Sequence, residues 1–282
     1  MNNKRTDHEL IIMLELSRNK SAPHRTKPSR ACRSVLPFMR IGETVLDYGC
    51  GKGFDSQYLT EMGLDVLSYD PYFAGKNIKK ESDWCLLFYV INVIEDLAER
   101  EYVLLNAYQL ARKWLGVGVT PHDEMTNKAI PYGDGRITSI NTFFTSYDAQ
   151  RAKRYIRAVL GLQPILTDSV LLMPSEIGEP IAHFELSRPE LQERMEDYRR
   201  EIIELRRSPY VWGDDCTLQP YQTRGVMRYR VFSESGQAEG KKFLYAGTGE
   251  PWGWVMDRFV NRDRLHILQD RLQYCREILP HL

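Results

Sequence analysis

Several features that would classify a protein at once are missing from this sequence of 282 residues. It has five cysteines but no C-x-x-C pair, so the usual spacing of a zinc site is absent. Lysine plus arginine equal aspartate plus glutamate, 38 against 38, so the formal net charge is zero. The chain as a whole therefore has no excess of positive charge that would attract polyanions. The longest apolar run, Trp84 to Ile94, contains Asn92 and is too short to span a bilayer. We therefore expect a folded protein without metal or membrane partners. The odd, scattered cysteines favour reduced thiols in the cytoplasm.

The glycine-rich loop near the start of the chain lacks the G-x-G-x-x-G spacing of dinucleotide-binding folds. Its glycines, Gly49, Gly51 and Gly53, stand at alternate positions after an apolar run that ends in Asp47, and a helical pattern follows at once. A second apolar run ends in Asp70, where an acid can hold ribose hydroxyls. This layout favours a charged nucleoside ligand without phosphate, lying across the carboxyl edge of a parallel sheet.

Strands alternate with helices through the first two thirds of the chain, which predicts a doubly wound, mostly parallel α/β sheet. The expected strands are 44–48, 65–69, 84–88 and 114–119, followed by an antiparallel pair at 163–167 and 170–174. The expected helices are 54–62, 90–113 and 148–160. Between Asp70 and Asp83 only a short linker fits, so the third strand of such a sheet and its helix are predicted to be missing.

Three parts of the chain follow from these patterns. Residues 1–40 form a helical leading segment, with helices at 6–19 and 29–39 and a basic stretch from 18 to 40. Residues 41–186 form the α/β domain. The motif Ser187-Arg-Pro-Glu190 starts a new helix with a capping box, which opens a mainly helical subdomain at 187–282 with a strand at 225–232 and a helix at 263–279.

The segment Asp47-Tyr-Gly-Cys-Gly-Lys-Gly53 resembles the first motif of class I S-adenosylmethionine-dependent methyltransferases. Over about residues 20–185 the chain is most similar to the DNA phosphorothioation-associated methyltransferases. The segments that carry this resemblance are Asp70-Pro-Tyr-Phe73, Tyr89-Val-Ile-Asn-Val-Ile-Glu-Asp96, and Tyr132-Gly-Asp-Gly-Arg-Ile-Thr138 with Thr142-Phe143 and Tyr147.

The resemblance implies S-adenosyl-L-methionine as the cofactor and assigns residues to it. Asp47 and the loop of Gly49, Cys50, Gly51 and Gly53 would hold the methionine portion. Asp70 would accept from the ribose hydroxyls, with Pro71 and Tyr72 next to it. Phe88 would help to wall the methyl group, although it could equally be core packing.

Four residues are candidates for catalysis. Tyr89 follows a strand and could face the methyl group or pack in the core, and Asn92 could face the ligand or cap a turn. His122 has a side chain suited to proton transfer, and a surface loop residue is the alternative. Tyr147 belongs to the family-like segment, which we expect to form a substrate lid.

The acceptor stays open between a small molecule and a nucleic acid. The Asp/Asn-Pro-Pro-aromatic motif of base amino-methylases and the Pro-Cys of cytosine ring methylases are both absent, although the basic stretch at 18–40 could contact phosphates. Two alternatives to methyl transfer remain: an enzyme that transfers or cyclises the aminocarboxypropyl group and releases methylthioadenosine, and a non-catalytic cofactor-sensing partner in DNA modification. The sequence leaves the oligomeric state open.

Overall fold

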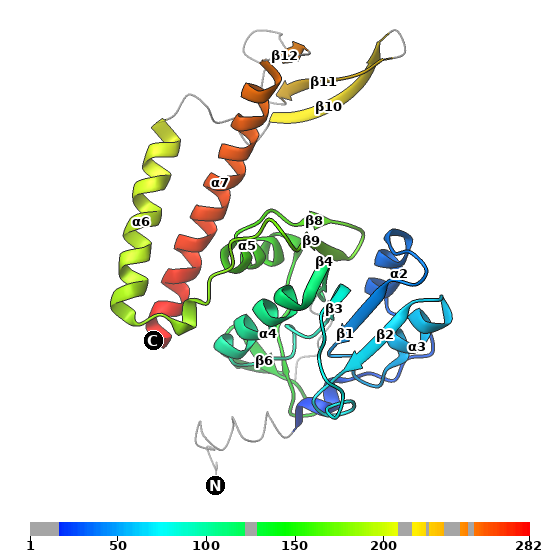
Figure 1. The fold of residues 1–282 in the computed structure, drawn as a ribbon. Coiled ribbons are helices and arrows are strands. Elements are labelled where there is room, and N and C mark those ends of the chain that lie inside the picture. The colour runs from blue at the N-terminus through cyan, green and yellow to red at the C-terminus, as the bar shows by residue number, and fades with distance from the viewer. Residues whose placement is uncertain (1–16, 122–128, 208–215, 224–225, 234–242, 248–250) are drawn as a thin grey trace. The chain divides into compact units, whose positions relative to one another are not determined.

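The computed structural model describes residues 17–121, 129–207, 216–223, 226–233, 243–247 and 251–282, with side chains up to residue 207 and from 258 onward. The chain divides into two compact units, Met1–Leu186 and Ser187–Leu282 (Figure 1).

The first unit is built on an open six-stranded sheet with the order β2-β1-β3-β4-β9-β8. Its strands are β1 (Thr44–Tyr48), β2 (Asp65–Tyr69), β3 (Ser82–Phe88), β4 (Ala111–Gly118), β8 (Ile165–Leu166) and β9 (Val170–Pro174). The first four are parallel, whereas β9 runs antiparallel to both β4 and β8. The predicted mixed α/β fold with a mostly parallel sheet is confirmed.

Two helices connect neighbouring parallel strands in opposite directions. Helix α3 (Phe54–Glu61) leads from β1 outward to β2, and α4 (Leu97–Leu110) leads from β3 to β4 on the other side. Because such crossovers are right-handed, α3 and α4 cover opposite faces of the sheet. The sheet is therefore doubly wound, and its direction reverses between β1 and β3, where this class of fold opens a crevice at the carboxyl ends of the strands.

The remaining helical elements of the first unit are short, apart from α5. They are η1 (Arg18–Ser21), α2 (Arg30–Val35), η2 (Leu36–Phe38), α5 (Ala149–Leu160) and η3 (His183–Glu185). Side chains from α2 and α3 join β1, β3 and β9 in one buried core that includes Cys32, Val45, Leu59, Leu86 and Leu172. The N-terminal segment is thus packed onto the sheet from residue 30 onward.

The predicted absence of a third strand and its helix is confirmed. Residues 70–81, all of which the structure describes, contain neither a strand nor a helix, and β2 is the outer strand of the sheet. This connection passes β1 on its way to β3 in the same direction as the α4 crossover, so right-handedness places it on the α4 face.

The predicted helix at 90–113 is wrong at both ends. Helix α4 begins only at Leu97, where the Asp96 carboxylate accepts from the Glu99 N–H at 2.7 Å, and Ala111 already has an extended backbone. The preceding residues cannot be helical because Tyr89 has a φ of 63° and the Asn92 side chain bonds to two other loops. Tertiary contacts override the helical periodicity there.

The long loop after β4 carries a small antiparallel sheet of its own. Its strands are β5 (Ile130–Tyr132), β6 (Gly135–Ile137) and β7 (Phe143–Phe144). Helix α5 follows with Asp148 as its N-cap and ends at Gly161, whose φ of 64° suits the left-handed end of a helix.

The second unit contains two long helices and an antiparallel sheet. They are α6 (Arg188–Arg207), α7 (Pro251–Ile278), the terminal turn η5 (Leu279–His281), and β10 (Cys216–Thr223), β11 (Val226–Ser233) and β12 (Phe243–Gly247). The Glu190 carboxylate accepts from the Ser187 N–H at 2.8 Å, as the capping box predicts. Only β11 was predicted among the three strands, and α7 begins twelve residues before the predicted 263.

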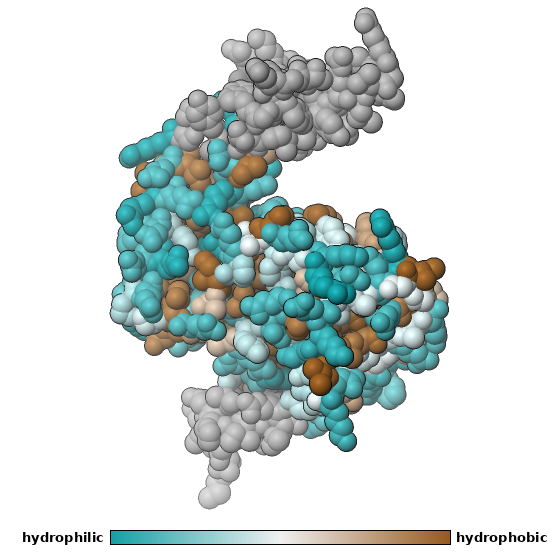
Figure 2. Space-filling model, in the orientation of Figure 1, coloured by the Kyte–Doolittle hydropathy of each residue, from teal (hydrophilic) through white to brown (hydrophobic). Residues whose placement is uncertain are grey.

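The surface of the described residues is mixed in polarity. Figure 2 shows hydrophobic residues dispersed among hydrophilic ones on the face drawn. Large hydrophobic side chains that are exposed include Ile41 and Ile177. Among the described helices, none combines the length and apolar character needed to cross a membrane.

Candidate functional site

The glycine loop between β1 and α3 is held by hydrogen bonds within the protein. Gly49 N and Cys50 N both donate to the Tyr69 carbonyl, at 2.7 and 3.0 Å, and Gly53 N donates to the Cys50 carbonyl at 3.0 Å. Gly51 N donates to the Asp70 carboxylate at 3.0 Å. With these amides engaged, the loop does not form a cradle of free N–H groups for a phosphate.

Two of the glycines are required by close approach as well as by backbone conformation. Gly49 has a φ of 86°, and a Cβ there would lie 2.3 Å from Cγ2 of Val90. Gly51 has a φ of 53°, and its Cβ would lie 3.2 Å from Cβ of Ala22. The loop is thus pressed between the turn after β3 and the N-terminal segment, which brings three parts of the chain together.

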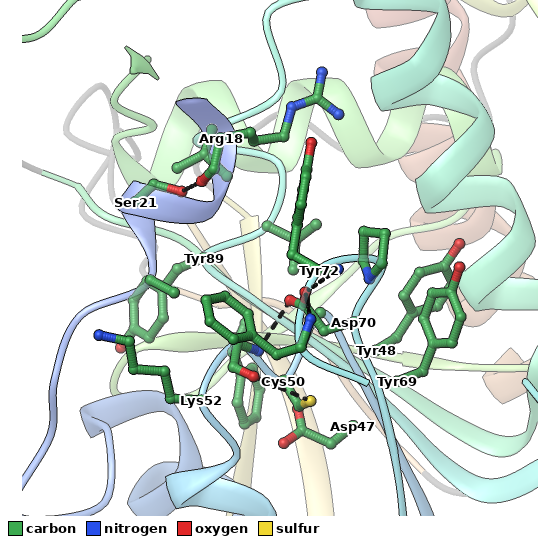
Figure 3. Close-up of a pocket in the computed structure, with 18 of the residues that line it drawn as sticks. Arg18, Ser21, Asp47, Tyr48, Cys50, Lys52, Tyr69, Asp70, Tyr72 and Tyr89 are labelled. Atoms are coloured by element: carbon green, nitrogen blue, oxygen red, sulfur yellow. Dashed lines mark hydrogen bonds between the residues drawn. The ribbon is translucent and has the colours of Figure 1, made fainter. Parts of the chain in front are cut away.

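Asp70 links the ends of β1 and β2. Its Oδ1 accepts from Tyr72 N at 2.9 Å and Phe73 N at 3.1 Å, and its Oδ2 accepts from Gly51 N. A carboxylate offers about four acceptor positions, so Oδ2 retains one for a further donor. Asp70 therefore orders both loops and still presents an oxygen to the crevice (Figure 3).

A pocket of about 340 Å³ occupies this crevice. Five segments line it: 18–25, the loop at 47–55, the end of β2 with 69–73, the end of β3 with 88–94, and the start of α4 with Lys79 beside it. Figure 3 shows Asp70, Cys50 and Asp47 at its centre, Lys52 and Tyr89 on one side, and Tyr48 and Tyr69 on the other. A pocket of this size lies within the range of small-ligand sites.

The carboxylate of Asp47, at the centre of the pocket, has little to compensate its charge. Asp47 is 3% exposed, and burial, opposed by a hydrogen bond from the Ser56 hydroxyl and assisted by Asp55 and Asp70, raises its pKa to about 7. Burial, together with the charges of Asp47 and Asp70, raises the pKa of the Cys50 thiol to about 12, so this thiol stays protonated. A cation in the pocket would relieve this concentration of negative charge.

Two cations at one side of the pocket have no ionic partner within the described residues. The Arg25 guanidinium carbon lies 5.4 Å from the ring centroid of Tyr89, and Lys52 is exposed. The Tyr89 hydroxyl itself accepts from Ala31 N at 3.2 Å. Both cations line the pocket and are free to meet an anionic group there.

The opposite side of the pocket is rich in tyrosine. The rings of Tyr48 and Tyr69 meet edge to face at 5.3 Å, and Lys79 Nζ lies 4.7 and 5.0 Å from their centroids. Tyr102 also lines the pocket, and it is exposed to solvent. This tyrosine end, defined by Tyr48, Tyr69, Lys79 and Tyr102, is suited to a planar ring.

The N-terminal segment forms one wall of the pocket because it is anchored to α4. Arg18 donates to both carboxylate oxygens of Glu99, at 2.6 and 3.0 Å, and to Glu95 at 2.8 Å. Further along, Ser29 N donates to Asp55 at 2.7 Å. Residues 18–29 are therefore fixed at both ends across the crevice.

Most of the residues that the sequence assigns to the cofactor line the pocket. They are Asp47, Gly49, Cys50, Gly51, Asp70, Pro71, Tyr72 and Phe88, joined by the catalytic candidate Tyr89. Gly53 is adjacent, as the N-cap residue of α3. His122 lies outside the described residues.

Asn92 and Tyr147 are buried in a different cluster. Asn92 Nδ2 donates to the Thr145 carbonyl at 2.6 Å, and its Oδ1 accepts from Thr120 N at 3.1 Å. The Tyr147 hydroxyl accepts from Arg100 at 2.9 Å. Neither residue is among those that line the pocket, and the bonds of Asn92 join the turn after β3 to the loops at Thr120 and Thr145.

Arg100 is the centre of that second cluster. Its guanidinium pairs with Asp134 at 2.6 Å and donates to the Ile94 carbonyl at 2.6 Å, with an exposure of 1%. Although burial opposes it, bonding to Arg100 and the charge of Arg151 hold the pKa of Asp134 below its ordinary value. The cluster fixes the small β5–β7 sheet to the start of α4.

Sequence reasoning missed Arg18, Arg25, Lys52 and Lys79 as pocket residues. Lys52 stands inside the recognised loop and could have been found there. Lys79 had no signal, because its place depends on how the connection after β2 folds onto α4. The described residues include no group of three or more His, Cys, Asp or Glu placed to hold a metal, and the four cysteines whose side chains are described are free thiols.

No protein-family model matches the chain, and neither does any curated protein sequence. The solved structures that match the chain include two methyltransferases. The first is 1,6-didemethyltoxoflavin-N1-methyltransferase of Burkholderia thailandensis with bound 1,6-didemethyltoxoflavin and S-adenosylhomocysteine, at 14% identity and a TM-score of 0.45, over 62% of this chain and 92% of that one. The second is magnesium protoporphyrin IX methyltransferase of Synechocystis PCC 6803 with bound S-adenosylhomocysteine, at 10% identity and a TM-score of 0.29, over 62% and 90%. At these values we draw nothing about this chain's ligand from either protein.

Proposed function

We propose that this chain binds S-adenosyl-L-methionine at the carboxyl edge of β1, β2 and β3 and transfers its methyl group to a small-molecule acceptor. The observation that carries the proposal is the order of charges along the pocket. Cations without an ionic partner among the described residues stand at one side, buried acids in the centre and tyrosines at the other side. The ligand has the matching order of carboxylate, ammonium and sulfonium, ribose, and base.

The glycine loop supports a ligand of this kind over a dinucleotide. Four of its amides, those of Gly49, Cys50, Gly51 and Gly53, donate to the protein itself. A pyrophosphate would need such N–H groups to be free. The loop instead contributes close backbone approach and the acids that flank it.

The residues at the centre and at the cationic side would each bind a different part of the ligand. Asp70 Oδ2 has room to accept from one ribose hydroxyl, since Oδ1 is occupied by two amides. Asp47 would face the cationic groups of the methionine portion, which favours its ionised form. Arg25 and Lys52 would pair with the carboxylate.

The sulfonium supplies an activated methyl carbon, so the protein's task is to bind, align and exclude water. Phe88 and Tyr89 stand at the end of β3, and the φ of 63° at Tyr89 turns the chain toward the pocket. Asn92 and Tyr147 are engaged elsewhere, so neither serves as a general base, and we assign the rate acceleration to alignment of the acceptor with the methyl carbon.

A small acceptor is favoured over a nucleic acid because three arginines of the basic stretch at 18–40 are bonded within the protein. Arg18 is paired with Glu95 and Glu99, and Arg30 is paired with Asp168 at 2.6 Å. Arg33 donates to the Pro28 carbonyl. These side chains are engaged within the chain, and the segment that carries Arg18 narrows access to the pocket.

Calorimetric titration with S-adenosylhomocysteine tests the proposal. We expect saturable binding that is lost in Asp70→Ala and kept in Asp65→Ala, an exposed acid at the opposite end of β2. Absence of heat at millimolar ligand in the wild-type protein would contradict the proposal, and so would equal affinity in Asp70→Ala.

Mass spectrometry of the spent cofactor, after incubation with a metabolite extract, tests the bond that is broken. S-adenosylhomocysteine as the product supports methyl transfer. Methylthioadenosine would assign the aminocarboxypropyl alternative instead, and binding without turnover of labelled cofactor would assign the sensing role.

A further inference from the structure

The N-terminal wall of the pocket is a strap, residues 18–28, that crosses the crevice. Arg18 and Ser21 lie across the pocket from Asp47 (Figure 3). The strap residues that line the pocket are Arg18, Asn19, Ser21, Ala22, Pro23 and Arg25. After the turn η1, residues 22–28 form neither a helix nor a strand. The position of the strap therefore depends on the contacts at its two ends and in its middle.

The end of the strap at Ser29 belongs to the buried core. Ser29 is 1% exposed, its N–H donates to Asp55 at 2.7 Å, and its hydroxyl accepts from Cys32 N at 3.0 Å as the N-cap of α2. Ala31, Cys32 and Val35 of that helix are fully buried. Because this end cannot leave its place without disrupting the core, it can act only as a hinge.

The end of the strap at Arg18 is held by charge. None of the residues of η1 is buried, but the Arg18 guanidinium donates to Glu99 at 2.6 and 3.0 Å and to Glu95 at 2.8 Å. The side chain of Glu99 is 41% exposed, so water can replace Arg18 there. Arg18 Nε is buried and, among the described residues, has no hydrogen-bond partner, which lowers the net gain from the ion pairs. This end is therefore the one that can open.

The middle of the strap touches two parts of the pocket. A Cβ at Gly51 would lie 3.2 Å from Cβ of Ala22, and the Arg25 guanidinium carbon lies 5.4 Å from the ring centroid of Tyr89. The residues on the other side of the strap are exposed, namely Pro23, His24, Thr26 and Lys27. The strap is thus a single layer of chain between the pocket and solvent.

We propose that the strap is a lid that rotates about Ser29, and that the ion pairs of Arg18 with Glu95 and Glu99 are its latch. The S-adenosyl ligand enters and leaves while the latch is open. When the latch closes, the strap sets Arg25 against the ligand. The identity of the ligand rests on the proposed function, whereas the latch rests on contacts within the chain.

The rates of ligand exchange test the latch. Arg18→Met removes the three hydrogen bonds and keeps an apolar side chain. Because the latch forms with and without ligand, its loss should raise the association and dissociation rates of S-adenosylhomocysteine by the same factor, about 10-fold, and leave Kd almost unchanged. Surface plasmon resonance with the full chain immobilised measures both rates. Faster dissociation with an unchanged association rate would make Arg18 a simple contact of the ligand and would overturn the proposal, as would no change in either rate.

Two further variants sharpen this measurement. Lys20→Met is the matched control, because it removes a cation of the same turn that is not among the pocket residues, and both rates should stay at the wild-type values. Equal acceleration in Lys20→Met and Arg18→Met would overturn the proposal. Glu99→Gln covers the case in which Arg18→Met does not fold. It keeps the bond from Glu99 N to Asp96 and should raise both rates by a smaller factor than Arg18→Met.

Trypsin tests the latch without ligand. The bond between Arg25 and Thr26 lies in the strap, and the closed strap holds Arg25 over Tyr89. Cleavage follows the open population when opening is fast, so it should be about 10-fold faster at this bond in Arg18→Met than in the wild type or Lys20→Met. Equal cleavage in Arg18→Met and the wild type would overturn the latch. Should the wild type fail to bind S-adenosylhomocysteine, the proposed function falls, and this measurement still decides whether the latch exists.

Discussion

Asp47 and Arg100 are both almost fully buried, but the charge of Arg100 is balanced by nearby groups and that of Asp47 is not. Arg100 is paired with Asp134 and bonded to the Ile94 carbonyl and the Tyr147 hydroxyl. Among the described residues, only the Ser56 hydroxyl donates to Asp47, and burial, together with two nearby acids, raises the pKa of Asp47 to about 7. The paired cluster stabilises loops, whereas the uncompensated one is a place where a bound cation would add stability.

The largest effect should come from removing Arg100. Arg100→Ala leaves the carboxylate of Asp134 without its main partner and should lower the free energy of unfolding by about 3–5 kcal/mol. Urea denaturation measures this change. The control is Arg112→Ala, whose half-exposed side chain lies 3.6 Å from Asp83, and it should cost less than about 1 kcal/mol. Equal losses in the two variants would show that the Arg100 cluster is not a structural centre.

Next in size are the glycine substitutions in the pocket loop. Gly49→Ala combines a φ of 86° with a Cβ 2.3 Å from Val90, so we expect a loss of about 2–5 kcal/mol from backbone strain plus overpacking. Gly53→Ala has a φ of 78° but no atom within 4 Å of its Cβ, so only the strain of about 1–2 kcal/mol should appear.

The double variant Gly49→Ala/Val90→Ala separates the two causes. It removes the colliding methyl group and should restore part of the stability lost in Gly49→Ala beyond the cost of Val90→Ala alone. Simple addition of the two losses would mean that the collision is relieved in another way.

Asp47→Asn should have an effect that depends on pH and has the opposite sign. The folded-state pKa of about 7 lies above the ordinary value of 3.8, so the folded protein binds more protons between these values and the wild type loses stability as pH rises from 4 to 7. The variant should therefore gain, relative to the wild type, up to about 4 kcal/mol by pH 8 and little at pH 4. Thermal unfolding across this range checks it.

The same group predicts how ligand binding varies with pH. The ammonium group of the ligand, which S-adenosylhomocysteine keeps although it lacks the sulfonium, favours ionised Asp47. The affinity for S-adenosylhomocysteine should therefore increase as pH rises through about 7, with proton release on binding. In Asp47→Asn this dependence should disappear. If the affinity of the wild type did not change with pH, the assignment of Asp47 to the ligand would be contradicted.

Arg25→Gln and Lys52→Gln should affect stability least, by less than about 0.5 kcal/mol, because neither side chain has an ionic partner in the described residues. Their effect should fall on the ligand. Affinity for S-adenosylhomocysteine should drop by about 10-fold, whereas affinity for methylthioadenosine, which lacks the carboxylate, should not change. A loss for both ligands would contradict the assignment of these cations to the carboxylate.

Local sequence signals located the elements around the glycine loop closely. The bounds of β1 and β2 were predicted because each apolar run ends at an acid and a turn, and the absent third strand was predicted because 70–83 is too short and polar. Most cofactor candidates line the pocket for the same reason, since a loop that joins a parallel strand to its helix lies at one edge of the sheet.

What the sequence could not provide were contacts between distant segments. The start of α4 depends on Asn92 bonding to Thr145 and Thr120, which no periodicity records. Arg100 looks like one of many charged residues on a helix, and its burial follows from Asp134 of another loop. Strands β10 and β12 were missed because their sequences carry weaker alternation than β11.

The anchored segment at 18–29 precedes the first strand of the sheet, yet the pocket depends on it. A shortened chain that starts at residue 41 would retain every strand of the six-stranded sheet, yet it would lack Arg18, Arg25 and the residues between them that line the pocket. Ser29 and Ala31, whose amides Asp55 and Tyr89 hold in place, would be gone too. Such a truncation would also lose Cys32 and the other side chains that α2 contributes to the buried core, so neither its stability nor its ligand affinity would represent the intact protein.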